Sequence, residues 1–148
     1  MPEPALPAPD NDLEPDEEKS DRTRDAGRRL FEDAFGRLLV KEARHVERLL
    51  KKRGDGPALA AAIGEFYDKH LETARGTLLP VVEAYADLRG QDRCALDEVV
   101  LSHIGQSRGQ LLGIIRDNDN GNLRAAIQNR LDQWLESRAA KAADEWSV

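Results

Sequence analysis

The stretch that decides the fold is AGRRLFEDAFGRLLVKEARHVERLL, residues 26–50. Apolar residues recur in it at intervals of three and four, the spacing that aligns side chains along one face of an α-helix. This pattern predicts one long amphipathic helix over about residues 22–53. The apolar residues that form its two neighbouring rows are Ala26, Leu30, Phe31, Ala34, Phe35, Leu38, Leu39, Ala43, Val46, Leu49 and Leu50.

The same period continues beyond this helix and is interrupted by turn residues. Gly54, Gly76, Gly90 and the run at 117–122 divide the rest of the chain into predicted helices at about 57–75, 78–89, 93–116 and 123–143. The helices at 57–75 and 78–89 could instead be one helix kinked near Pro80. No stretch has the alternation of a β-strand. We therefore expect an all-α protein, a bundle of about five amphipathic helices that forms a single domain over residues 22–148.

Residues 1–21 differ in composition from the rest of the chain. They contain five prolines, eight acidic residues and Lys19 as the one base, a formal charge of −7 in a chain of net charge −6. Only Leu6 and Leu13 are sizeable apolar residues there. Such a segment buries too little surface to offset the entropy lost on ordering. We expect a disordered, Pro-rich acidic linker or tail ahead of a helical domain that is itself close to neutral.

Residue types that carry catalysis or bind metals are few and scattered. Cys94 is the only cysteine, which excludes an internal disulfide and a cysteine-based zinc site. The turn DNDNGN at residues 117–122 lacks the ligand spacing of a calcium-binding EF-hand. His45, His70 and His103 stand alone on their predicted helices and are interpreted as polar edges of the core. We predict no catalytic, cofactor or metal site, and a protein that is not an enzyme.

Basic residues of the first helix are spaced so that they form one stripe, diluted by Glu42 and Glu47. Such a stripe can contact phosphates of DNA, face solvent, or lie against acids of a neighbouring subunit. Its members are Arg37, Lys41, Arg44, Arg48, Lys51 and Lys52. Trp146 lies outside the apolar pattern and is either frayed or an anchor for a partner. Aromatic residues predicted to pack between helices are Phe31, Phe35, Phe66, Tyr67, Tyr85 and Trp134.

Three groups of residues resemble a known family. They are FGRLLVKE at 35–42, then EFYDKH at 65–70 with Leu79-Pro80 and Ala84-Tyr85, and finally Ser102-His103, Ser107-Arg108, Leu111-Leu112 and WLESRA at 134–139 with Ala142. Their order over residues 22–146 resembles the C-terminal helical, crown-side region of tailed-phage portal proteins of the HK97-like type, which a Pro-rich linker also precedes. This chain lacks the wing, stem and clip of a full portal, so the resemblance implies an excised segment or a free-standing relative.

The resemblance implies a structural role in phage assembly. Portals form a dodecameric ring at one capsid vertex, through which DNA is packaged and ejected and to which the tail attaches. We therefore predict an assembly module that forms a homo-oligomer or binds other phage head and packaging proteins, with loose contact to double-stranded DNA. The alternative is a small helical adaptor or regulatory protein that binds a partner helix or nucleic acid, with the acidic tail modulating binding.

The expected location follows from the same considerations. The chain has no run of about 18 apolar residues, so no contact with a membrane is expected. Its N-terminus has prolines and acids in place of the positive start and apolar stretch of a signal peptide. We predict the virion, at the capsid vertex, or the host cytoplasm, and no secretion by a signal of its own.

Overall fold

The structure is a computed structural model that describes residues 8–53, 57–89, 96–118 and 121–147, with side chains for residues 21–53, 57–87, 96–118 and 121–147. All of its regular structure is helical, and the described residues contain no strand. The prediction of an all-α bundle is therefore confirmed. The predictions that involve Gly90 and Cys94 lie outside the described residues.

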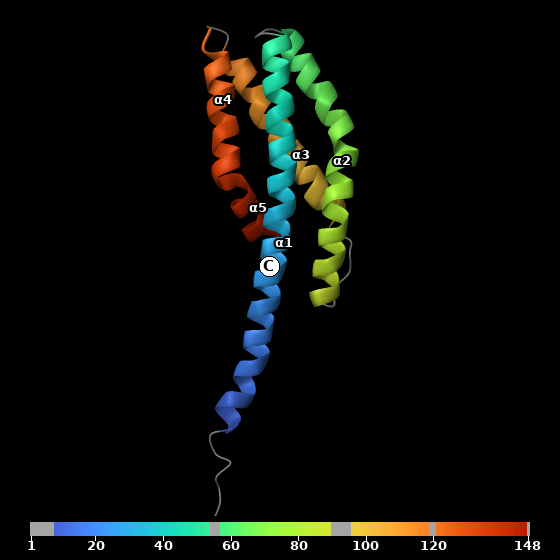
Figure 1. The fold of residues 1–148 in the computed structure, drawn as a ribbon, viewed down its shortest axis with the longest axis vertical. Coiled ribbons are helices and arrows are strands. Elements are labelled where there is room, and N and C mark those ends of the chain that lie inside the picture. Colours follow the sequence, from blue (N-terminus) through green and yellow to red (C-terminus); the bar gives the residue numbers. More distant parts are fainter. Residues whose placement is uncertain (1–7, 54–56, 90–95, 119–120, 148) are drawn as a thin grey trace, which may run out of the picture.

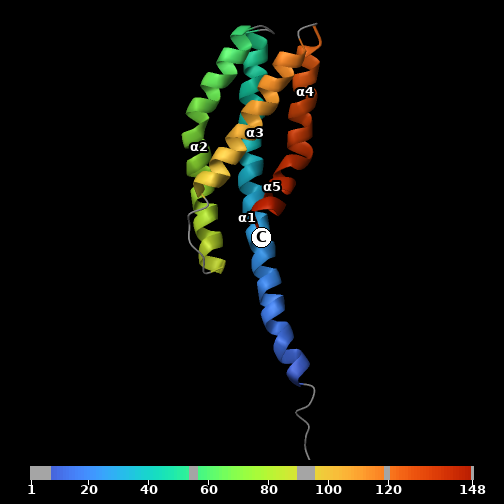
Figure 2. The same ribbon diagram turned by 180° about the vertical axis from the view of Figure 1, so that it is seen from behind.

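The helices run up, down, up and down in chain order, as Figures 1 and 2 show from opposite sides. They are α1 (Ala8–Arg53), α2 (Pro57–Arg89), α3 (Leu96–Asp117) and a last helix in three parts. These parts are α4 (Leu123–Gln133), the π-helical turn η2 (Trp134–Arg138) and α5 (Ala139–Trp146). α1 lies between α2 and the last helix, and α3 crosses the bundle obliquely (Figure 2).

The two helices expected at 57–75 and 78–89 are one continuous helix, α2, with Pro80 inside it. A proline there removes one backbone hydrogen bond and costs up to about 3 kcal/mol. Burial of one apolar face on both sides of the proline offsets this cost, since Ala74, Leu78 and Val81 are all buried. Over the residues that the structure describes, the count of about five helices is therefore corrected to four, the last of which contains a π-helical turn.

The first helix begins at Ala8 rather than near residue 22, and its N-terminal part projects beyond the bundle (Figure 1). This corrects the prediction of a disordered tail over residues 8–20, while residues 1–7 lie outside the described residues. Acidic residues stabilise the first turns of a helix through its dipole, and Pro9 is tolerated at the start because it would donate no helical hydrogen bond there.

The core lies along α1, where aromatic side chains meet from three helices. Phe31 stacks on Phe35 at a centroid distance of 6.2 Å and meets the edge of Tyr85 at 5.5 Å. Tyr85 in turn covers Gly27, where a Cβ would overlap the phenol ring. Most of the aromatic residues predicted to pack between helices are buried, namely Phe31, Phe35, Tyr67, Tyr85 and Trp134. Phe66 is half-buried, and Trp146 packs partly buried against the core.

Candidate functional site

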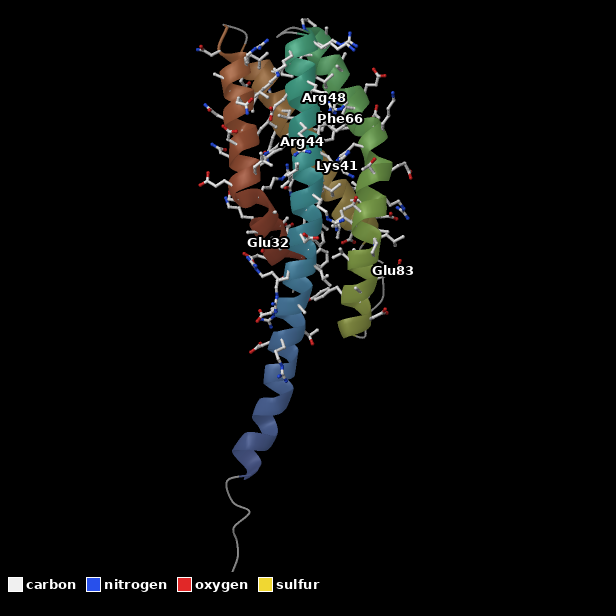
Figure 3. The ribbon with its side chains drawn as sticks, viewed as in Figure 1. Glu32, Lys41, Arg44, Arg48, Phe66 and Glu83 are labelled. Carbon is white, nitrogen blue, oxygen red and sulfur yellow. The ribbon has the colours of Figure 1, made fainter. Side chains whose placement is uncertain are left out.

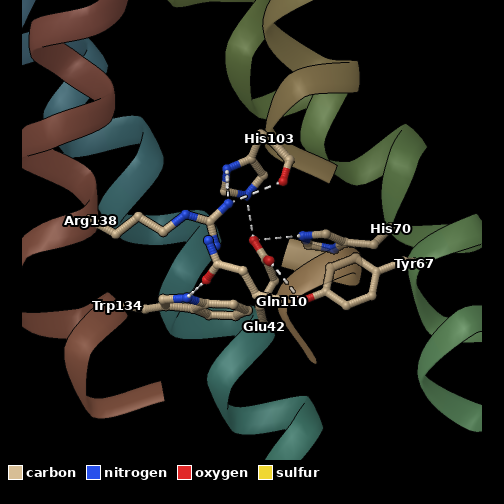
Figure 4. A network of polar contacts seen from close by, with 7 residues as sticks. All are labelled: Glu42, Tyr67, His70, His103, Gln110, Trp134 and Arg138. Atoms are coloured by element: carbon tan, nitrogen blue, oxygen red, sulfur yellow. Dashed lines mark hydrogen bonds and ion pairs between the residues drawn. The ribbon is translucent and has the colours of Figure 1, made fainter. Parts of the chain in front are cut away.

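A buried carboxylate lies at the centre of the bundle. Glu42 comes from α1 and its side chain is fully buried. Tyr67 of α2 donates its hydroxyl to Glu42 Oε1 at 2.9 Å, and His103 of α3 donates from Nε2 to Oε2 at 2.6 Å (Figure 4). His70 of α2 places Nε2 3.3 Å from the same Oε2. Three helices therefore converge on one carboxyl group.

The surroundings of Glu42 keep it ionised. Burial by itself would raise the pKa of this carboxyl, but attraction to His103 and contacts with His103 and His70 outweigh it and hold the pKa far below its usual value. Burial and the negative charge of Glu42 raise the pKa of the Tyr67 hydroxyl, which therefore remains a donor. The carboxylate is thus an acceptor with donors on both oxygens.

The last helix joins this network through Arg138. The Arg138 guanidinium donates from Nη2 to the backbone oxygen of His103 at 3.1 Å and lies 4.6 Å from the centre of the Trp134 ring. Burial lowers the pKa of Arg138, and the charge of Glu42 partly counters that effect. Trp134 donates from Nε1 to Gln110 Oε1 at 2.6 Å, which ties the turn η2 to α3. The network therefore links all four helices.

The core of this cluster is buried, and within the described residues His70 Nε2 and Arg138 Nη1 have no hydrogen-bond partner, although His70 Nε2 lies within ion-pair distance of Glu42. In the part of the chain that the structure describes, no group of three or more His, Cys, Asp or Glu side chains is arranged to hold a metal ion. Buried polar networks of this kind select one arrangement of helices, because any shift would leave a buried donor or acceptor unpaired. We interpret the network around Glu42 as the element that sets the register of the bundle.

The basic stripe lies on the outer face of α1, where Lys41, Arg44 and Arg48 are seen in Figure 3. We call the exposed side chains of Arg37, Lys41, Arg44, Arg48, Lys51 and Lys52 the basic ridge. Arg37 pairs with Asp33 one turn away at 3.3 Å. Among the residues that the structure describes, Lys41, Arg44, Lys51 and Lys52 have no acidic partner within ion-pair distance.

On one side of the basic ridge, a hollow of about 500 Å³ opens between α1 and η2. Its floor is mainly apolar, and it contains Leu135, which is 50% exposed. Arg37, Lys41 and Arg44 form its basic rim. We call it the apolar hollow; its other lining residues are Asp33, Gly36, Leu39, Val40, Trp134, Leu135 and Ala139.

On the other side of the ridge, aromatic rings line a second hollow of about 440 Å³ between α1 and α2. His45 stacks on Phe66 at a centroid distance of 4.1 Å, and Phe66 stacks on His70 at 4.9 Å. Burial, together with the nearby charges of Arg48 and His70, lowers the pKa of His45. The ridge is therefore flanked by a mainly apolar hollow on one side and by an aromatic hollow on the other.

Two parts of this arrangement were missed by sequence reasoning. Glu42 was taken as an acid that dilutes the stripe, yet it lies on the buried side of α1, four residues after Leu38 and four before Val46. A carboxylate in phase with an apolar row was the available signal. His70 and His103 were interpreted as separate polar edges of the core, but the structure brings both onto Glu42.

Comparison with protein-family models, curated proteins and solved structures finds no match for this chain. The resemblance to portal proteins therefore stays a prediction. Within the described residues, no helix combines the length and the apolar character needed to cross a membrane.

Proposed function

We propose that this protein is a structural assembly module that self-associates through the outer face of α1. The observation that carries the proposal is the apolar hollow beside the basic ridge, because the two together offer what a protein interface needs. Apolar contact excludes water at the centre of an interface, and charged residues around it select the partner and its orientation. Lys41 and Arg44, which rim the hollow, have no acidic partner among the described residues.

A protein partner fits this face better than a nucleic acid does. Contacts to a phosphate backbone need cations and polar donors but no apolar pocket. Leu135, half exposed at the hollow, is a side chain whose burial would add stability on contact with another protein. Acidic side chains of a neighbouring subunit are therefore the partners that we propose for the ridge.

The bundle supports such a role because it holds the face rigid. The ridge stands on one side of a helix whose opposite side is buried, and the network around Glu42 joins that helix to the other three. A preformed face loses little conformational entropy on binding. A portal-type ring at a capsid vertex is one assembly that such a face could build, and it remains the specific form of this proposal that native mass will test.

The experiment is native mass, measured by light scattering over a concentration series from about 1 μM to 1 mM, a span typical of weak to moderate association. We expect mass above the 16.5 kDa of one chain, rising with concentration. Leu135→Asp should weaken association at least about tenfold, because it places a charge in an apolar contact. Leu101→Asp is the matched control, since Leu101 is 62% exposed on α3 and does not line the hollow.

The native mass and the two leucine variants distinguish the possible forms of association. A closed ring of about a dozen copies would support the portal form, whereas a smaller closed oligomer would support assembly without it. A mass of 16.5 kDa at every concentration would overturn the proposal. Equal loss of association in both leucine variants would place the interface elsewhere.

A further inference from the structure

We infer that the acidic N-terminal segment of a second copy docks along the basic ridge and into the apolar hollow, reciprocally in an antiparallel pair. This inference rests on the proposed self-association and names the surface and the partner segment. It concerns residues 8–21, which we call the acidic segment. Its acids are Asp10, Asp12, Glu14, Asp16, Glu17, Glu18 and Asp21, against Lys19 alone.

The charges of the two surfaces are complementary. The acidic segment carries a formal charge of −6 by this count, and the basic ridge carries six cations, Lys51 and Lys52 included. Each has the length of a few helical turns, so part of one row can lie along part of the other. Complementary rows of charge favour one orientation and disfavour others.

The ridge cannot be reached by the acidic segment of the same chain. α1 is one helix from Ala8 to Arg53, and both surfaces belong to it. At a rise of about 1.5 Å per residue, Leu13 and Lys41 are roughly 42 Å apart along the axis. The acidic segment projects away from the bundle (Figure 1). Any contact between the two must therefore be made between copies.

The acidic segment also carries an apolar residue that suits the hollow. Leu13 is its one large apolar residue, surrounded in sequence by acids. The hollow has an apolar floor and a rim of cations, so one leucine flanked by carboxylates matches it in both respects. A nucleic acid would use the ridge but would leave the hollow empty.

An antiparallel pairing makes these contacts coincide. In two antiparallel helices, a step toward the N-terminus on one helix opposes a step toward the C-terminus on the other. A register that sets Leu13 opposite Val40, which lines the hollow, also sets Asp12 opposite Lys41 and Asp16 opposite Arg37. The contact therefore uses the Arg37 and Lys41 end of the ridge, and Arg48, Lys51 and Lys52 lie beyond the acidic segment. In a two-fold symmetric dimer each pair occurs twice. The contact then closes on itself with two copies, so a ring of about a dozen copies would contradict this inference while supporting the portal form of the proposed function.

The test is a charge swap in the full-length chain. One variant, ridge-reversed, is Arg37→Glu with Lys41→Glu, and the other, tail-reversed, is Asp12→Lys with Asp16→Lys. We expect each alone to dimerise at least about tenfold more weakly than the wild type, because like charges then face each other. Mixed at equal concentration, they should form a heterodimer of near wild-type affinity, because both contacts are complementary again. The matched control is Lys69→Glu with Arg116→Glu, exposed cations outside the hollows beside the ridge.

The readouts are native mass and, for mixtures, energy transfer between differently labelled chains. Circular dichroism checks that each variant remains folded, and an unchanged signal assigns any loss of association to the altered contacts. Wild-type association that neither variant weakens would overturn this inference and leave the proposed function standing. A wild type that is monomeric throughout would overturn both. Loss of binding to double-stranded DNA in the ridge-reversed variant, with self-association unchanged, would assign the ridge to nucleic acid.

Discussion

Replacing Glu42 by glutamine tests whether the buried network stabilises the fold. The substitution keeps the shape of the side chain but turns one of its two acceptor oxygens into a donor. Glu42 now accepts from Tyr67 on one oxygen and from His103 on the other. The amide can accept from only one of them at a time, so its NH₂ group must face either the Tyr67 hydroxyl, which would then have to accept, or His103 Nε2, which would have to give up its proton.

The expected cost follows from these contacts. One charge-assisted hydrogen bond contributes about 1.5–3 kcal/mol, and a buried group left unpaired costs about 1–3 kcal/mol. Arg138 also loses its nearby countercharge. We expect Glu42→Gln to lower the free energy of unfolding by about 2–4 kcal/mol. This is at or slightly below the loss of stability, about 3–5 kcal/mol, that follows when one partner of a buried ion pair is removed. Tyr67→Phe removes one hydrogen bond and should cost less, about 1–2 kcal/mol.

The assay is urea unfolding followed by circular dichroism at neutral pH. With a slope of about 1–3 kcal/mol per molar urea, the midpoint should fall by roughly 1–2 M in Glu42→Gln with an unchanged slope. Glu65→Gln is the matched control, because the Glu65 side chain is 71% exposed. A loss below about 0.5 kcal/mol, the usual range of surface substitutions, would refute the structural role of the network.

Three further predictions concern pH and the backbone of the helices. Because the pKa of Glu42 is lowered in the folded state, the stability that Glu42 contributes is fully present above its ordinary pKa of 4.5 and is lost as pH falls below that value. The urea midpoint should therefore fall less between pH 7 and pH 3 in Glu42→Gln than in the wild type. Gly27→Ala should lower the free energy of unfolding by about 1–3 kcal/mol, because the new methyl group would overlap the Tyr85 ring. Its control, Gly105→Ala, lies in open space on α3 and should raise the free energy of unfolding by up to about 1 kcal/mol. Equal shifts of the two variants in thermal melts would contradict the packing at Tyr85. Pro80→Ala should stabilise the chain by about 1–2 kcal/mol in urea unfolding, since it restores a helical donor, and a loss of stability would mean that the proline shapes α2.

The buried network and the outer face of α1 have separate roles. Glu42 and its donors hold the four helices in one arrangement, and the ridge and hollow use that arrangement as a rigid platform. Variants on the ridge should therefore change association without changing the unfolding midpoint. Variants of Glu42 should change the midpoint first. Measuring both quantities on each variant keeps loss of the interface apart from loss of the fold.

Local pattern was sufficient for much of the fold. The period of three and four in residues 26–50 predicted α1, and the exposed positions of Arg37, Lys41 and Arg44 follow from the same period. It was not sufficient at Pro80 and in the acidic segment. Proline is a strong local signal for a break, yet buried residues on both sides of Pro80 keep α2 continuous. Composition alone suggested disorder over residues 8–20, where the backbone continues α1.

The sequence by itself determined the helical class, the amphipathic faces and the row of cations, because these depend on residues within a few turns of one another. Only the tertiary structure decided what meets at Glu42 and what lies beside the ridge. Tyr67 and His103 are 25 and 61 positions away from Glu42 in the chain, and the apolar hollow joins α1 to a turn near the C-terminus. Such meetings are set by how helices cross and in which register they pack, and no local period encodes either.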